Sequence, residues 1–307
     1  MLHTKRKGEW FEIIVPQNWE GKSIDDLFRM EWEAPKKLTH IFRVEEMVLV
    51  NGVRANWNTP LVQGTKLQLK LFETEEIKVI PTFINVPVLY EDEHVIVFNK
   101  PPFMPTHPND PKVEVNTLVN AAAFHLQSQG EIRNIRQIHR LDKDTSGAVL
   151  FAKHALAGAI LDRMLEKREI KRTYIAIVHG LLKMKKGTIK EPIGRDRHHP
   201  TKRRVSTSGQ EAKTNFQILK LEKNNHITYI KCSLETGRTH QIRVHLSHIG
   251  HPLVGDMLYG GKPFVNRQAL HAVKLEFTHP LTHEKIECHA PFLDQPPIFK
   301  GIDPYLI

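Results

Sequence analysis

The sequence predicts an α+β protein, built on a mixed, largely antiparallel sheet that is flanked by helices and preceded by a small α+β module. Runs of strand length recur over residues 148–278, but they alternate irregularly with helical stretches, unlike a regular βαβ repeat. The chain also lacks the glycine-rich phosphate loop of a Rossmann or P-loop protein. A shorter unit of helices and a hairpin precedes this pattern.

The N-terminal module is predicted from local signals. Residues 23–26, Ser-Ile-Asp-Asp, have the capping-box pattern that starts a helix, and Pro35 suits the first turn of a second helix. Asn51-Gly52 between apolar runs predicts a β-hairpin. Residues 66–71 alternate with a period of two, as a half-buried strand does.

An acidic, proline-containing stretch then separates this module from a larger domain, whose first buried strand is the apolar run 95–100. The predicted division is a module over residues 1–75, a linker over 76–85, a large domain over 86–293 and a tail over 294–307. In the large domain we expect strands near 148–153, 173–179, 211–220, 226–234 and 270–278, and helices near 116–128, 155–169 and 239–249.

The positive charge of the chain is concentrated in one region. Residues 163–204 contain fourteen Lys and Arg against four Asp and Glu, an excess equal to the net charge of +10, whereas residues 1–80 are neutral. A local excess of this kind suits a phosphate backbone, which makes nucleic acid the expected partner. Two alternative explanations of the basic cluster are a lysine-rich surface that only aids solubility and a surface that binds anionic lipid. The sequence contains no amphipathic anchor that would favour lipid binding.

Other classes of protein are disfavoured by composition. No apolar run approaches the roughly 18 residues that cross a bilayer, and the basic start is not followed by a signal segment, so we expect a cytoplasmic protein. Cys232 and Cys288 are too few for a disulfide scaffold, and free, buried thiols are expected.

The most informative stretch is His139–Gly147, which places carboxylates beside an arginine in a turn before the apolar run 148–152. A charged loop at the end of a buried strand is well placed for chemistry, although the same residues also suit an ordinary solvated turn. In a second segment, Thr239 is expected to cap a helix that carries Arg243 beside an apolar face. An ion pair between Asp142 and Arg243 is therefore attractive, with a rim salt bridge as the simpler interpretation.

Together with the strand-like run 171–180 and the segment 250–256, these stretches resemble four ordered motifs of the RluA-like family of RNA pseudouridine synthases, over about residues 86–293. The first 72 residues are similar to the S4-like module that precedes many such domains. There, Glu45-Glu46 stands where a glycine is common, and the module is neutral, so its RNA binding is left open.

The resemblance implies that Asp142 is the catalytic carboxylate, that Tyr174 lies against the target base and that Arg243 is the partner of the aspartate. Arg140 matches the arginine that helps to extrude the nucleotide. Whether Asp142 attacks C1′, attacks C6 or deprotonates the sugar is left open. Further RNA contacts are expected at His139, Lys171, Arg172, Lys202, Arg203, Arg204 and Arg238.

We expect a monomer that needs no cofactor or metal and acts on RNA, with ribosomal RNA favoured over transfer RNA. The alternatives are a metal nuclease, suggested by nineteen histidines, and a non-catalytic RNA-binding module. His245 and His248 share a helical face, but no carboxylate or cysteine pair accompanies them at ligand spacing. Ser146 lacks the Gly-x-Ser-x-Gly elbow of a serine nucleophile.

Overall fold

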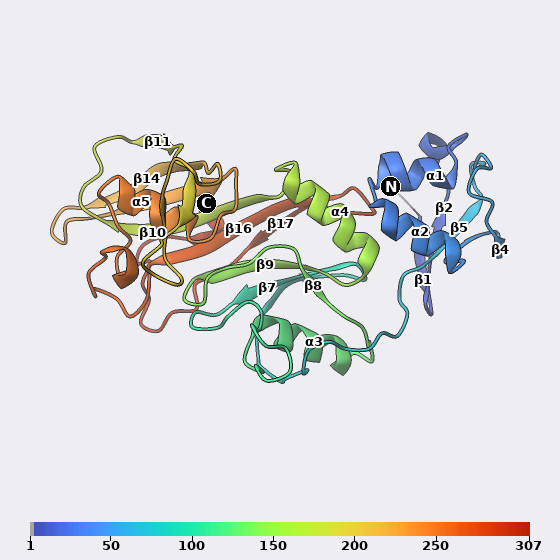
Figure 1. The fold of residues 1–307 in the computed structure, drawn as a ribbon, viewed down its shortest axis with the longest axis horizontal. Coiled ribbons are helices and arrows are strands. Elements are labelled where there is room, and N and C mark those ends of the chain that lie inside the picture. Colours follow the sequence, from blue (N-terminus) through green and yellow to red (C-terminus); the bar gives the residue numbers. More distant parts are fainter. Residues whose placement is uncertain (1–2) are drawn as a thin grey trace.

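The structure, a computed structural model, describes residues 3–307 and contains a small sheet, a large sheet and a separate two-stranded hairpin, with their helices (Figure 1). The small sheet belongs to an N-terminal module at one end of the molecule, drawn in blue. Within the described residues, no helix is both long and apolar enough to cross a membrane. The predicted α+β class with a mixed, largely antiparallel sheet is confirmed.

The N-terminal module combines short strands and short helical segments: β1 (Thr4–Lys7), β2 (Trp10–Ile14), η1 (Gln17–Trp19), α1 (Ile24–Asp26), η2 (Leu27–Glu31), α2 (Lys36–Val44), β3 (Val48–Val50), β4 (Val53–Arg54) and β5 (Lys66–Lys70). Its antiparallel sheet has the order β1-β2-β5-β3-β4. The predicted capping box is present, because the Ser23 hydroxyl accepts from the Asp26 N–H at 3.1 Å and Asp26 accepts from the Ser23 N–H at 2.9 Å. Asn51 and Gly52 have φ of 50° and 82°, as the tight β3–β4 turn requires.

The rest of the chain forms the larger part, in this order: β6 (Val88–Glu91), β7 (Val95–Lys100), α3 (Leu118–Ser128), β8 (Arg136–Gln137), β9 (Ser146–Ala152), α4 (Ala155–Glu166), β10 (Lys171–His179), β11 (Lys186–Ile189), β12 (Ile193–Arg195), β13 (Arg203–Val205), β14 (Thr214–Glu222), β15 (Ile227–Leu234), α5 (Gln241–His248), η3 (Met257–Tyr259), β16 (Leu270–Thr278), β17 (Lys285–His289) and η4 (Pro304–Leu306). The main sheet has the order β11-β14-β15-β10-β16-β9-β7-β6, with β8 beside β9 and β17 beside β16. Both cysteines are free and buried, as predicted.

Helices cover the two faces of the sheet because successive strand residues point to opposite sides. Val97 and Leu150 pack in the apolar cluster that includes α4, whereas Phe98 and Phe151 pack in the cluster that includes α3. Figure 1 accordingly places α3 and α4 on opposite sides of β7 and β9. Ile242 of α5 joins the cluster of α3, so α5 covers the same face farther along the sheet.

The two antiparallel halves of the sheet meet where β9 and β16 run parallel. The pairing is short, with His271 opposite Ser146 and Ala272 opposite Gly147. Gly147 has a φ of +115°, and a Cβ on it would lie 2.2 Å from the Ala272 carbonyl oxygen. Only glycine allows this approach, and the loop that carries Asp142 enters the sheet here.

Aromatic packing joins the N-terminal module to the larger part of the chain. The Phe11 ring lies 4.5 Å from the His94 ring, and the Phe72 ring lies 5.9 Å from His94 and 5.8 Å from His154. His154 caps α4 by accepting from the Ala157 N–H at 3.2 Å. The module is therefore packed against the start of the helix that lies between the two sheets (Figure 1).

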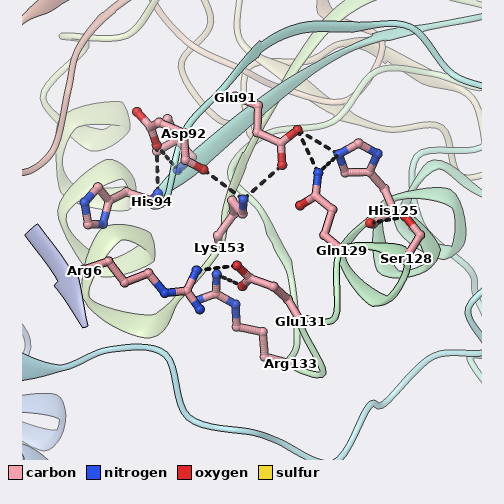
Figure 2. Close-up of polar contacts among 11 residues, drawn as sticks. Arg6, Glu91, Asp92, His94, His125, Ser128, Gln129, Glu131, Arg133 and Lys153 are labelled. Carbon is pink, nitrogen blue, oxygen red and sulfur yellow. Dashed lines mark hydrogen bonds and ion pairs between the residues drawn. The ribbon is translucent and has the colours of Figure 1, made fainter. Parts of the chain in front are cut away.

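Ionic contacts reinforce this interface (Figure 2). Arg6 of β1 and Arg133 both point to the Glu131 carboxylate, and the Arg6 guanidinium lies 4.2 Å from the centre of the Phe72 ring. On the same side, the Lys153 ammonium pairs with Glu91 at 3.0 Å. The stretch between β5 and β6 contains no helix or strand among the described residues, so these contacts position the module.

Replacing Gly147 by alanine is expected to lower the free energy of unfolding by about 3 kcal/mol, because backbone strain adds to overlap with Ala272. Gly130→Ala is the matched control, since Gly130 has a φ of +79° but open space where its Cβ would lie. It should cost only about 1 kcal/mol. Urea unfolding measures both, and equal losses would mean that the β9–β16 approach tolerates a side chain.

Stability is also expected to fall in acid. Burial lowers the pKa of His94 and His139 to about 3 and that of His271 to about 4. The folded state therefore stays neutral while the unfolded state gains protons below about pH 6.5, which costs about 1.4 kcal/mol per pH unit for each histidine. Urea unfolding between pH 7 and pH 5 should show this slope, and His94→Phe should make it shallower. A flat profile would contradict it.

Candidate active site

A cavity of about 540 Å³ opens on the face of the large sheet that α5 covers. Its wall contains Asp142 from the loop before β9, Tyr174 from β10 and Arg243 from α5. The structure thus brings together the three segments that the sequence singled out. Cavities of roughly 300 to 1,000 Å³ hold ligands of nucleotide size.

The Asp142 loop, residues 139–147, is held in place by hydrogen bonds to its backbone N–H and carbonyl groups. The Thr106 hydroxyl donates to the Leu141 carbonyl at 2.8 Å and accepts from the Leu141 N–H at 3.1 Å. The Thr145 N–H donates to the Asp142 carbonyl at 3.0 Å, which closes a tight turn. These bonds fix the direction in which the Asp142 side chain leaves the loop.

Two buried basic side chains, Lys100 and Arg267, lie beneath the same loop. The Lys100 ammonium donates to the carbonyls of Pro101, Met104 and Lys143 at 2.9, 2.8 and 3.0 Å. Burial, followed by the nearby charge of Arg267, lowers the pKa of Lys100 to about 7. Arg267 itself donates to the carbonyl of Asp144 at 3.1 Å.

Arg243 is the centre of the charged groups in the cavity. Its Nε and Nη2 donate to the two carboxylate oxygens of Asp256 at 2.7 and 2.9 Å, and its Nη1 donates to Asp142 Oδ2 at 3.0 Å. Burial lowers the pKa of Arg243, but the hydrogen bonds to Asp256 and the charge of Asp142 outweigh it and raise the pKa above its ordinary value. Arg243 is therefore a permanent cation held between two carboxylates.

The Asp142 carboxylate is engaged unevenly. Arg243 binds Oδ2, whereas no hydrogen bond or ion pair within residues 3–307 reaches Oδ1. The Asp142 side chain is 19% exposed, and it borders the cavity. One carboxylate oxygen is anchored and the other is free to meet a ligand.

The opposite wall is aromatic and basic. Tyr174 is 4% exposed, and burial raises the pKa of its phenol, which keeps the ring neutral. Arg172, two residues earlier on β10, has a buried Nε without a hydrogen-bond partner in the described part of the chain. A Cβ at Gly237 would lie 3.0 Å from Arg172 Nη1, so the glycine leaves room for this guanidinium.

The helix that carries Arg243 begins differently from the prediction. Thr239 does not cap it, because α5 begins at Gln241 and its N-cap residue is His240, in a left-handed conformation and without a side-chain cap. The turn is instead closed by the Gln241 side chain, whose amide oxygen accepts from the Arg238 N–H at 3.0 Å and from the Thr236 hydroxyl at 2.7 Å. The hydrogen bonds of Gln241 within this turn therefore replace the expected side-chain cap of the helix.

The residues expected to contact RNA fall into different places. Arg140, Arg172 and Arg238 line the cavity. His139 is 7% exposed and its Nε2 accepts from the Leu150 N–H at 3.2 Å, so it supports the loop and is not placed to contact a phosphate. Lys171 alternates with Arg172 along β10 and points to the other face of the sheet, away from the cavity.

The remaining expected contacts, Lys202, Arg203 and Arg204, lie on or beside the β12–β13 hairpin. The hairpin rests on the elements around the cavity, because the Arg203 N–H donates to the Tyr259 hydroxyl at 2.8 Å. Ile193 of the hairpin shares an apolar cluster with Val244 of α5 and with Tyr259. The basic hairpin is thus attached to the helix that holds Arg243.

Several groups that build the site were not assigned from the sequence. Asp256 lies in the segment 250–256 of the family resemblance, but nothing local in the sequence assigned a contact to it or to Tyr259. Lys100 ends the fully buried strand β7, and a lysine at such a position is a usable signal, because buried lysines need partners. Among residues 3–307, no group of three or more His, Cys, Asp and Glu is arranged to hold a metal ion.

Comparison with known proteins gives the following matches. The model of the RNA pseudouridylate synthase family matches residues 94–248, and that of the RluD ribosomal pseudouridine synthase N-terminal domain matches residues 11–67. An uncharacterized RNA pseudouridine synthase of Bacillus subtilis, YhcT, is 45% identical over 94% of this chain and 95% of its own. The ribosomal large subunit pseudouridine synthase D of Haemophilus ducreyi is 38% identical over 80% of this chain and 79% of its own.

A solved structure is also similar. The human RNA pseudouridylate synthase domain containing 1 superposes with a TM-score of 0.56 and 26% identity, over 68% of this chain and 84% of that chain.

Asp256→Asn is expected to lower the free energy of unfolding by about 3 kcal/mol, because it leaves Arg243 buried with one carboxylate instead of two. Urea unfolding measures the loss. Asp144→Asn, in the Asp142 loop but without a side-chain ion pair or hydrogen bond in the described residues, should be neutral. An equally small loss for Asp256→Asn would mean that Asp256 does not stabilise the buried guanidinium.

Proposed function

This chain belongs to the RluA-like family of RNA pseudouridylate synthases, and we propose that it isomerises uridine in large-subunit ribosomal RNA with Asp142 as its catalytic carboxylate. The observation that supports this role most strongly is the placement of Asp142. Asp142 lines the cavity, Arg243 binds one of its carboxylate oxygens at 3.0 Å, and the other has no hydrogen bond or ion pair within residues 3–307.

The reaction explains why an ionised carboxylate is needed. The N1–C1′ bond of uridine breaks, the uracil turns, and a C5–C1′ bond forms; the proton lost from C5 is balanced by the proton gained at N1. A carboxylate can assist by attacking carbon or by removing a proton from the sugar. In either case Asp142 is paired with Arg243, which carries a permanent positive charge.

The uridine must leave its stack to reach such a cavity. Tyr174, on the cavity wall, offers a neutral ring against which the uracil lies, which offsets roughly 1 to 3 kcal/mol of lost stacking. Arg140 is exposed at the edge of the same cavity, where its side chain fills the space that the base vacates. Lys100 and Arg267 act through the loop backbone and do not touch the nucleotide.

The RNA backbone is held by basic groups around the opening. Arg172 and Arg238 line the cavity, and the β12–β13 hairpin adds Lys202, Arg203 and Arg204 beside it. Arginine binds phosphate through several N–H donors, and Arg172 is partly exposed in the cavity lining. The local positive excess over residues 163–204 raises the attraction further.

We assign to the N-terminal module an orienting role, with direct RNA binding left to the hairpin side. Residues 1–80 are electrically neutral, and the module is anchored to the larger part by Arg6 and Phe72. The domain division into 1–75, 76–85, 86–293 and 294–307 remains part of this proposal. So do a monomeric state and a cytoplasmic location.

The choice of ribosomal RNA rests on relatives that are named ribosomal large subunit pseudouridine synthase D, such as those of Haemophilus ducreyi and Pasteurella multocida. The experiment is to map pseudouridines by carbodiimide modification and primer extension, with and without the gene. Loss of one or a few sites in large-subunit ribosomal RNA is expected, and restoration by the wild-type gene is the control. If pseudouridines are lost only from transfer RNA, the substrate is transfer RNA and not ribosomal RNA. If no pseudouridine is lost from either RNA, the proposal is contradicted.

Substitutions of Tyr174 should separate the ring from its hydroxyl. Tyr174→Phe is expected to be mild, because the hydroxyl makes no hydrogen bond within the described residues and stacking needs only the ring. Tyr174→Leu should lose about 1 to 3 kcal/mol of transition-state stabilisation, and its single-turnover rate should fall accordingly. Rates measured at saturating RNA test this, and equal losses in both variants would point to the hydroxyl instead.

A further inference from the structure

A histidine that the mechanism has not yet used stands next to Asp142. His240 lines the cavity, and its Nε2 lies 3.8 Å from Asp142 Oδ2. Its backbone has a φ of +58°, a left-handed conformation that a bulky side chain adopts only at a cost. Although it occupies the N-cap position of α5, its side chain caps nothing and is directed to Asp142 and Tyr259 instead.

Tyr259 decides which nitrogen of His240 carries the proton. The Tyr259 hydroxyl accepts from the Arg203 N–H at 2.8 Å and lies 2.9 Å from His240 Nδ1. Its own proton has an acceptor within residues 3–307 only if it is donated to His240 Nδ1. Nδ1 is then an acceptor, so the proton of the neutral imidazole is on Nε2.

The Nε2–H group is therefore an unused donor at the reacting centre. A separation of 3.8 Å is too long for a hydrogen bond to Asp142, whose Oδ2 already receives the Arg243 Nη1–H. Burial lowers the pKa of His240, against the opposing charges of Asp142 and Asp256, which favours the neutral donor form. The side chain is 13% exposed, and the residue lines the cavity.

Resting on the proposed function, we propose that His240 is a further catalytic residue, whose Nε2–H donates a hydrogen bond to O2 of the target uracil. When the N1–C1′ bond breaks, its electron pair goes to the uracil and spreads over N1, O2 and O4. O2 is bonded to the carbon beside N1, so it lies next to the bond at which Asp142 acts. The 2′-hydroxyl of the ribose gains no such charge, which makes it the poorer acceptor for this donor.

This assignment also gives Tyr259 a function. Tyr259 is a positioning residue that holds His240 in the Nε2–H tautomer and connects it to the backbone of the basic hairpin through Arg203. The charge that develops on the base is then met by a neutral donor, while Arg243 is committed to Asp142 and Asp256. Arg243 thus stabilises the Asp142 carboxylate, and His240 stabilises the uracil that leaves C1′.

The test uses the full-length protein and a synthetic RNA that carries the mapped target site, with either uridine or 2-thiouridine at that position. His240→Asn tolerates the left-handed backbone, but its shorter amide does not reach the position of Nε2, and His240→Gln restores an N–H donor of similar reach. His248→Ala, at an exposed position on α5, is the matched control. Single-turnover rates and RNA dissociation constants are measured for each pair.

His240→Asn should lower the rate on uridine RNA by roughly 10² to 10³-fold with unchanged RNA affinity, and His240→Gln should recover part of it. Because sulfur accepts hydrogen bonds poorly, 2-thiouridine should slow the wild type but not slow His240→Asn further. A wild-type rate in His240→Asn, or an equal sulfur effect in both proteins, would overturn the inference. A wild type inactive on uridine RNA would instead overturn the proposed function.

Discussion

The active site depends on one buried arginine. Arg243 binds Asp256 with two hydrogen bonds of 2.7 and 2.9 Å, so its guanidinium cannot turn, and the remaining Nη1 meets Asp142 at 3.0 Å. A buried charge of this kind is stable only with its partners, which fixes the distance between α5 and the Asp142 loop. The same contact leaves Oδ1 of Asp142, a residue that lines the cavity, without a hydrogen bond or ion pair among the described residues.

The fold supplies this geometry at the join between its two antiparallel halves. The strands β9 and β16 pair in parallel through only a few residues, and Gly147 permits the approach. The Asp142 loop enters β9 at this join, where Lys100 and Arg267 donate to its carbonyls from below. A loop held through its backbone keeps its side chains free for a ligand, which is what a rigid catalytic site requires.

Much of this could be predicted from the sequence because the signals were local. The capping box at Ser23, the turn at Asn51-Gly52 and the apolar strands depend on neighbours in the chain, and the structure contains them. The approach of Asp142 to Arg243 was also expected, since a half-buried arginine needs a carboxylate. Its assigned role rests on the family resemblance.

The remainder could not be predicted, because it depends on contacts between distant segments. The bond between Tyr259 and Arg203 joins groups 56 residues apart, and Arg267 reaches the Asp142 loop across 123 residues. Thr239 failed as a cap because Gln241 closes the turn with its own side chain. The strand β8 has only two residues, too few for a periodic pattern, and was not predicted.

The most direct test of the proposed role of Asp142 is the release of tritium from RNA labelled at C5 of uridine, since that proton leaves once in each isomerisation. Wild type and Asp142→Asn would be assayed at saturating RNA, with Asp144→Asn as the carboxylate control from the same loop. Release by wild type and Asp144→Asn, and none by an Asp142→Asn protein that still binds the RNA, is the predicted result. Comparable release by Asp142→Asn would contradict a catalytic role for the Asp142–Arg243 pair.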